Sequence, residues 1–241
     1  MRLFIIRHGD PDYQNDTVTE KGKREVELLS QKLVKENISK IYCSPLGRAR
    51  ATAAPTCEKT GLEPIVLDWL QEFPATRVVT DYVKEGDVCP WNLAPTYWTR
   101  FPENFDPVNW RKSPMFDEWT LNWYDKVCQS FDDLLSDHGF VRNGMYYDIK
   151  EGYEDSTETI AFFCHLGLGN ALLSHITGVP LPQWWHTIFL PTSSVSTVFM
   201  EKHRRDLPNT AIARVVAIGD TSHLYAGGEP ISNSGLHNPM P

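Results

Sequence analysis

Short apolar runs that alternate with helical segments are the feature that most constrains the fold of this chain. Residues 3–6 form a β-branched apolar run that ends at polar residues, and residues 20–37 repeat apolar side chains at helical spacing behind Thr19, a residue type that caps helices. Further strands are expected at 41–43, 65–67, 159–164, 195–200 and 213–218, and further helices at 44–61 and 170–176. This alternation predicts an α/β fold, in which helices cover a mostly parallel central sheet.

The alternation is interrupted once, by residues 74–150. This segment holds five of the eight tryptophans and, between Pro74 and Pro114, six prolines, and it is too long to be a plain loop. A helix is expected at 117–138 and a tight turn at Asn143-Gly144. We therefore expect a single domain, residues 1–241, with an aromatic- and proline-rich, largely helical insertion at about 74–150. Its clustered aromatic side chains favour a local core, with a lid over the substrate pocket as an additional role.

Charge and cysteine usage narrow the class of partner. The chain has 23 basic and 31 acidic residues, a net charge of −8, which argues against a nucleic-acid or anionic-membrane binder. No run approaches the roughly 18 apolar residues of a membrane span, and the apolar run near Met1 does not resemble a signal peptide. The five cysteines are scattered without a Cys-x-x-Cys pair, which predicts neither a disulfide framework nor a zinc site. We therefore expect a cytoplasmic protein that acts on a small molecule.

Polar residues follow the predicted strands at their carboxyl ends, where open α/β sheets bind ligands. Arg7 and His8 follow the first strand, Arg48 and Glu72 the second and third, and His165 the fourth. The planar fork of arginine suits phosphate oxygens, and a neutral imidazole nitrogen can attack phosphorus. The set therefore predicts a phosphoryl-transfer site. The arginines and a protonated His165 would neutralise charge on the phosphoryl oxygens without a metal, while a carboxylic acid protonates the leaving oxygen.

Ordered motifs carry a resemblance to a known family. Arg7-His8-Gly9 ends the first strand, Ser44-Pro45-Leu46 leads to Arg48, Glu72 closes a Leu-Gln-Glu sequence, and His165 follows an apolar strand. Thr-Glu-Lys-Gly at 19–22 and Asp-Thr-Ser-His-Leu at 220–224 add a helix entry and a late motif. Together these motifs resemble the histidine phosphatase superfamily, in its phosphoglycerate mutase-like branch, over residues 2–72 and 158–224.

The resemblance implies a three-layer α/β/α sandwich of the phosphoglycerate mutase-like type and a metal-independent phosphatase that needs no cofactor. It implies that His8 is the nucleophile, which becomes a phosphohistidine. The implied catalytic residues are His8, Arg7, Arg48, Glu72 and His165, with Glu72 as the general acid. The implied phosphate-binding residues are Arg7, His8, Arg48 and His165, to which Asn15 in the loop after the nucleophile is expected to add a contact.

Two positions depart from the family pattern, and a third is a candidate for supporting the site. Leu166 stands where the family usually has glycine directly after the second histidine, and Asp10 where Glu or Gln is commoner. These departures predict a different pocket mouth. His223 follows the last predicted strand and is a candidate for a supporting position behind the site.

Other functions remain open at this stage. A phosphoglycerate mutase-type phosphotransferase is the alternative of the same family, although Tyr-Gly and Trp-Arg-Arg stretches typical of such mutases are not evident around residues 75–115. A metallohydrolase that uses residues 8–12 as ligands lacks clear partner ligands elsewhere in the chain. A non-catalytic phosphate-ester binding module is the alternative outside enzymology. The partner expected in each phosphoryl-transfer case is a small-molecule phosphate monoester, with specificity set by residues 74–150.

Overall fold

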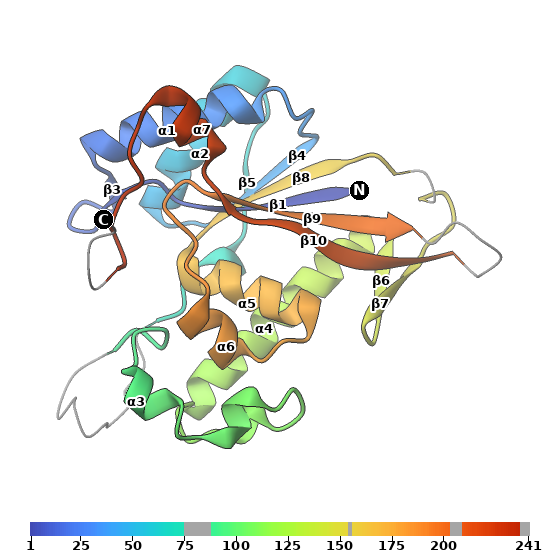
Figure 1. Cartoon of the computed structure of the whole chain (residues 1–241). Coiled ribbons are helices and arrows are strands. Elements are labelled where there is room, and N and C mark those ends of the chain that lie inside the picture. Colours follow the sequence, from blue (N-terminus) through green and yellow to red (C-terminus); the bar gives the residue numbers. More distant parts are fainter. Residues whose placement is uncertain (75–87, 154–155, 203–208, 237–241) are drawn as a thin grey trace.

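An eight-stranded sheet forms the centre of the protein (Figure 1). The structure is a computed structural model that describes residues 1–74, 88–153, 156–202 and 209–236. The strands of the sheet, in the order in which they lie side by side, are β5 (Ile65–Val66), β4 (Lys40–Cys43), β8 (Thr159–Cys164), β1 (Arg2–Arg7), β9 (Val195–Lys202), β10 (Thr210–Asp220), β7 (Tyr146–Ile149) and β6 (Phe140–Asn143). The two-residue strands β2 (Pro11–Asp12) and β3 (Thr17–Val18) pair separately in the loop after β1.

The sheet is mixed, with its parallel part confined to one half. β5, β4, β8 and β1 run parallel to one another, whereas β9, β10, β7 and β6 join as antiparallel neighbours. Gly144 and Met145 alone connect β6 to β7, and so short a connection permits only an antiparallel pair. The expected α/β fold is confirmed, and the parallel half is the one that carries the predicted site residues at its carboxyl end.

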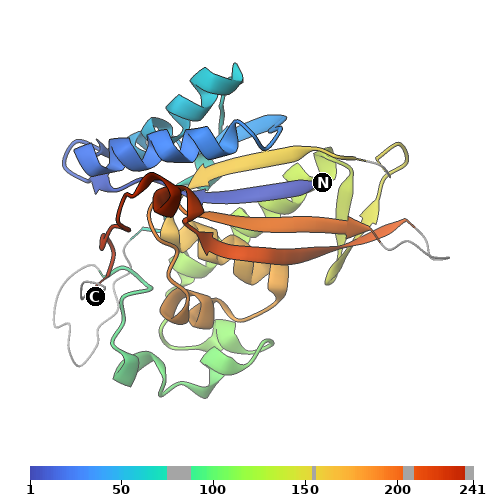
Figure 2. The same ribbon diagram turned by 45° about the horizontal axis from the view of Figure 1, so that its top comes forward.

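Helices cover both faces of the sheet (Figures 1 and 2). One layer contains α1 (Glu20–Leu33), α2 (Gly47–Thr60) and α7 (Ser222–Gly227), and the other contains α4 (Glu118–Asp137), α5 (Leu166–Thr177) and α6 (Leu181–Thr187). The short α3 (Pro95–Trp98) and the 3-10 turns η1 (Asp68–Leu70), η2 (Pro102–Phe105) and η3 (Trp110–Lys112) lie between them in sequence. The expected three-layer α/β/α arrangement is confirmed. Within the described residues, no helix combines the length and the apolar character that a membrane crossing requires.

Strand β1 divides its side chains between two hydrophobic cores. Phe4 and Ile6 belong to the core under α1 and α2, whereas Leu3 and Ile5 belong to the core shared with α4 and α5. Successive side chains of a strand point to opposite faces, so an uninterrupted apolar run is what a strand covered on both sides requires. This double burial fixes the position of the residues that follow Ile6.

Three helices differ in length from the sequence expectation. Helix α1 ends at Leu33 rather than near residue 37, and Asn37 adopts a left-handed conformation with φ 51°. Helix α2 begins at Gly47 rather than at Ser44, because the Ser44 hydroxyl accepts a hydrogen bond from the Leu46 backbone N–H (3.3 Å) in a turn before the helix. Helix α5 begins directly after His165, four residues earlier than expected.

The described part of the aromatic segment contributes to the main layers as well as to a small core of its own. The helix expected at 117–138 is confirmed as α4, whose Asp117 side chain accepts from the Thr120 N–H, and the turn expected at Asn143-Gly144 joins β6 to β7. A separate cluster around α3 consists of Leu93, Tyr97, Trp98 and Met115. Residues 75–87 of the expected insertion lie outside the described residues.

Phe162 on β8 provides a test of the core. Its side chain is fully buried and contacts the rings of Tyr42 (5.5 Å between centroids) and Phe131 (5.8 Å). We expect Phe162→Ala to lower the free energy of unfolding by about 3–5 kcal/mol, because the lost contacts leave a cavity. Urea unfolding measures this loss. Phe199→Ala on β9 is the matched control, since Phe199 is 43% exposed, and it should cost less than about 1 kcal/mol. Equal losses in the two variants would contradict the assigned core.

Candidate active site

The ends of three neighbouring parallel strands bring the predicted histidines together. Arg7 pairs with Cys164 in the β1–β8 register, and the His8 backbone N–H donates to the Cys164 carbonyl (3.0 Å). His8 and His165 are therefore the first residues beyond two adjacent strands, and Ser44 is the first beyond β4. The two imidazole rings lie 5.2 Å apart between centroids, and both are buried. The pairing of the strands thus assembles the centre of the predicted site.

The hydrogen bond of His8 defines which ring nitrogen is free. Its Nδ1 lies 2.8 Å from the Gly9 carbonyl oxygen, which can only accept, so Nδ1 carries the proton and donates. Burial, and next the charge of Arg7, hold the pKa of His8 well below its usual range. The ring is therefore neutral near pH 7, with its lone pair on Nε2. The Gly9 N–H donates to the Thr52 hydroxyl (2.9 Å), which anchors the loop to α2.

His165 is held by Ser44. The Nε2 atom of His165 lies 2.8 Å from the Ser44 hydroxyl oxygen, and this oxygen also accepts a hydrogen bond from the Leu46 N–H. The Ser44 hydroxyl can therefore donate its proton to Nε2, and we assign the ring proton of His165 to Nδ1. Burial, and next the neighbouring His8, lower the pKa of His165 well below its usual range. The expectation of a protonated His165 is therefore not met, because burial and the nearby His8, Arg48 and Arg7 disfavour a positive charge on its ring. The negative charge of a phosphate would act on this pKa in the opposite direction.

Arg7 is fixed by two distant segments. Its Nη1 donates to the Leu190 carbonyl (2.7 Å) and its Nη2 to the Ser234 carbonyl (3.1 Å), while its Cζ lies 5.3 Å from the centre of the Phe189 ring. Burial lowers the pKa of Arg7, yet a guanidinium stays charged at any physiological pH. Its buried Nε has no hydrogen-bond partner among the described residues.

Arg48, in the first turn of α2, is held by an aspartate that the sequence reading missed. Asp16 Oδ1 accepts from Arg48 Nη1 (2.7 Å), and Asp16 Oδ2 accepts from the Gly47 backbone N–H (2.6 Å) at the start of the helix. A Cβ at Gly47 would overlap the Asp16 carbonyl, so this approach requires glycine. The Tyr13 ring lies 5.5 Å from Arg48 Cζ. In the sequence, the glycine directly before Arg48 was the signal that another part of the backbone approaches this position closely.

Glu72 caps the helix that begins beside His165. Its Oε2 accepts from the Gly167 N–H (3.0 Å), and its Oε1 accepts from the N–H groups of Leu168 (2.9 Å) and Phe73 (3.0 Å). Burial raises the pKa of Glu72, although these three donors act in the opposite direction. The cap also explains why α5 starts early: its first N–H groups find their acceptor in a residue about 95 positions away.

The two supporting candidates have different positions. Asn15 is exposed, and its side chain donates to Asp12 (2.7 Å), so the structure does not bring it to the histidines. His223 is buried, and its Nε2 lies 3.0 Å from the Ser193 hydroxyl, while the Ser193 N–H donates to the His8 carbonyl (3.0 Å). Burial lowers the pKa of His223 to about 4. Ser193 therefore links His223 to the backbone of His8.

A buried carboxylate that the sequence reading missed braces the same loops. Glu25 of α1 is fully buried, and it accepts from the Asp10 backbone N–H (2.8 Å) and from the Thr192 hydroxyl (3.0 Å). It therefore ties the loop after His8 to the loop before Ser193. Glu25 was not a candidate from the sequence, because a glutamate in an amphipathic helix is usually solvated.

The described residues give no support to a metal site. No group of three or more His, Cys, Asp or Glu side chains among them is placed to hold a metal ion. The side chain of Asp10 is engaged with Thr19 (2.6 Å) and Ser232 instead. The metallohydrolase alternative therefore lacks a ligand set in this part of the chain.

Comparisons with known proteins agree with this arrangement. A family model described as histidine phosphatase superfamily (branch 1) matches residues 3–119. The phosphoserine phosphatase 1 of Hydrogenobacter thermophilus is 24% identical over 215 residues, which cover 85% of this chain and 89% of that protein. A probable phosphatase of Schizosaccharomyces pombe is 37% identical over 75 residues, 27% of this chain and 36% of that one.

Solved structures show the same fold. A phosphoserine phosphatase from Entamoeba histolytica in complex with 3-phosphoglyceric acid has a TM-score of 0.61 at 18% identity, over 92% of this chain and 98% of that one. A mycobacterial glucosyl-3-phosphoglycerate phosphatase has a TM-score of 0.58 at 20% identity, over 90% and 98%. The chain therefore matches the histidine phosphatase superfamily over residues 3–119, and it has the phosphoglycerate mutase-like fold.

Proposed function

We propose that this protein is a metal-independent phosphomonoester hydrolase in which His8 accepts the phosphoryl group. The observation that carries the proposal is the hydrogen bond from His8 Nδ1 to the Gly9 carbonyl, because it leaves the Nε2 lone pair free beside a second imidazole. An oriented, neutral imidazole is the form that attacks phosphorus. Relatives named as phosphatases support the same activity.

The cationic groups have the role of holding the phosphoryl oxygens. Among the described residues, three buried nitrogen atoms have no hydrogen-bond partner here: the Nε of Arg7, the Nε of Arg48 and the Nδ1 of His165. Phosphate oxygens are strong acceptors, and donors fixed in advance stabilise the charge that spreads over them during transfer. Arg7, Arg48 and His165 therefore bind the phosphate, while Asn15, which is exposed, does not contribute.

Glu72 is the proposed general acid. In the first step a bond forms between His8 Nε2 and phosphorus, the ester P–O bond breaks, and the leaving oxygen takes the Glu72 proton. In the second step a water attacks phosphorus and gives a proton to Glu72, the N–P bond breaks, and phosphate leaves. Burial favours the protonated carboxyl group that the first step needs, because it raises the pKa of Glu72.

Two alternatives differ from hydrolysis in their products. A phosphoglycerate mutase-type phosphotransferase would return the phosphoryl group to an organic acceptor, and a non-catalytic binding module would release no phosphate. The proposed partner is a small-molecule phosphate monoester rather than nucleic acid or a membrane, in keeping with the net charge of −8. All five cysteines lie in the described residues as free thiols, which fits the reducing cytoplasm that we propose as its location.

His8→Ala tests the nucleophile. We expect phosphate release to fall at least about 10³-fold, because no other described side chain replaces the Nε2 lone pair. The assay contains excess chelator, in which the wild-type protein should keep its activity. When the reaction with a substrate labelled in its phosphoryl group is quenched rapidly without acid, the label should be found on the wild-type protein and not on His8→Ala. His175→Gln is the control, since His175 binds Asp132 (2.9 Å) away from the site. Turnover near the wild-type rate in His8→Ala would refute the proposal.

Glu72→Gln tests the acid through the leaving group. Hydrolysis of an alkyl phosphate should fall about 10²-fold or more, because the alkoxide that leaves needs a proton. Hydrolysis of p-nitrophenyl phosphate should fall less than about tenfold, since its leaving group is stable as an anion. The ratio of the two kcat/KM values measures the effect. An equal loss for both esters would assign Glu72 to capping α5 alone.

The pH profile tests both protonation states. His8 acts as a neutral base whose pKa is lowered from 6.5, so the acid limb of kcat/KM should lie below pH 6.5. Glu72 acts as an acid whose pKa is raised above 4.5, so activity should fall as the pH rises through this raised pKa. Glu72→Gln should lose this alkaline limb and keep the one due to ionisation of the substrate. A profile of the variant with the same alkaline limb would contradict the assignment.

A further inference from the structure

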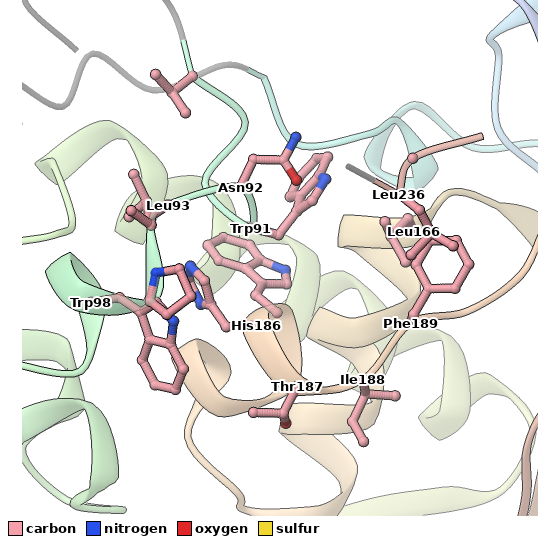
Figure 3. A pocket seen from close by; sticks show the side chains of 15 residues that line it. Trp91, Asn92, Leu93, Trp98, Leu166, His186, Thr187, Ile188, Phe189 and Leu236 are labelled. Carbon is pink, nitrogen blue, oxygen red and sulfur yellow. The ribbon is translucent and has the colours of Figure 1, made fainter. Parts of the chain in front are cut away.

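A cavity of about 520 Å³ is lined by side chains that include Trp91, Trp98 and Phe189 (Figure 3). Its wall is built from residues 88–98, 185–189 and 235–236 and from Leu166, segments that lie far apart in the sequence. Phe189 in this wall is 5.3 Å from Arg7 Cζ, and Leu166 directly follows His165. A Cβ at Gly235 would lie 3.0 Å from Arg7 Nη2. The cavity therefore begins where the phosphate site ends.

The cavity also adjoins the proposed acid. A Cβ at Gly167 would overlap Trp91 Cζ3 and would lie 2.8 Å from Glu72 Oε1, so Trp91 and Glu72 approach the same glycine. Trp185 Nε1 donates to the Gly167 carbonyl (2.9 Å), which holds that backbone against the wall. An ester oxygen beside Glu72 consequently carries its organic group toward Trp91 and the cavity.

The wall is apolar and carries no formal charge in its described residues. Its apolar side chains include those of Trp91, Leu93, Trp98, Leu166, Ile188 and Phe189. None of the described lining residues is Lys, Arg, Asp or Glu. The His186 ring stacks on Trp98 (4.7 Å between centroids), and burial lowers its pKa to about 4, so it is neutral near pH 7. A carboxylate or ammonium group placed here would lose its hydration without a counter-charge.

We infer that the site selects phosphate monoesters of apolar alcohols, with an alkyl or aryl group in this cavity, over esters whose alcohol carries a carboxylate or an ammonium group. The inference rests on the proposed phosphatase function and adds the substrate class to it. It separates this chain from relatives named for phosphoserine, a substrate that carries both charges. Leu166, where the family usually has glycine, adds an apolar side chain where the cavity meets His165.

Matched alkyl esters test the inference on the wild-type protein. Butyl phosphate, hexyl phosphate and 5-carboxypentyl phosphate have leaving alcohols of similar basicity, so differences in kcat/KM report the cavity rather than the chemistry. Each methylene that enters the cavity is expected to raise kcat/KM about fourfold, which places hexyl about tenfold or more above butyl phosphate. Hexyl phosphate should also exceed 5-carboxypentyl phosphate and phosphoserine by at least about tenfold.

A charge placed in the wall should reverse this preference. Ile188→Lys should lower the hexyl to carboxypentyl ratio at least about tenfold, because the new ammonium group pairs with the carboxylate. Ile212→Lys is the matched control, since Ile212 lies on β10, 49% exposed and outside the cavity, and its ratio should stay that of the wild type. Folding of both variants is checked by circular dichroism, and the wild-type series remains decisive if Ile188→Lys unfolds.

The outcomes separate the inference from the function on which it rests. Equal or higher kcat/KM for the carboxypentyl ester or phosphoserine, with hydrolysis that still depends on His8, would overturn the apolar preference and leave the phosphatase standing. Absence of hydrolysis of every ester would instead overturn the phosphatase, and the substrate class with it.

Discussion

The parallel pairing of β1 with β8 is the constraint on which the rest of the structure depends. Arg7 lies opposite Cys164, and the His8 N–H donates to the Cys164 carbonyl, so both histidines leave the sheet at the same height. A slip of one residue would turn every side chain of β1 to the opposite face and would expose one core while it misplaced His8. The hydrophobic effect that buries Leu3–Ile6 on two faces therefore also determines the distance between His8 and His165.

Sequence reasoning reached those parts of the fold and the site that depend on local pattern. Apolar runs and caps predicted six of the eight strands of the sheet and the helices α1, α2, α4 and α5, and the motif residues at strand ends predicted that His8 and His165 would meet. Interactions between distant segments left no local signal: Glu72 caps a helix about 95 residues away, and Asp16 holds Arg48. The neutral state of His165 also depends on its three-dimensional surroundings, because burial outweighs the usual basicity of imidazole.

Electrostatics at this sheet edge favour an anion. Arg7 and two neutral imidazoles are buried here and Arg48 is half-buried, and each guanidinium keeps a buried Nε without a partner among the described residues. Burying such donors costs free energy unless an acceptor meets them, and a phosphate group supplies oxygens on several sides. Hydrogen bonds behind the site, such as the one from the Asp10 N–H in the loop after His8 to Glu25 of α1, hold this loop in place while one phosphate group replaces another. Rigid donors of this kind need little reorganisation during transfer.

In the proposed function, chemistry and selectivity are divided between different parts of the chain. The sheet edge would supply the phosphate-binding groups, and solved structures at about 18–20% identity share the fold that forms this edge. The aromatic segment, the end of α6 with the residues after it, Leu166 and residues 235–236 supply the cavity wall. The two parts meet at two places. Phe189 of the wall lies beside Arg7, and Trp91 of the wall and Glu72 both lie close to Gly167. On the proposed function, a change in the wall would therefore alter how the alcohol is held while the strand ends that carry His8 and His165 stay in place.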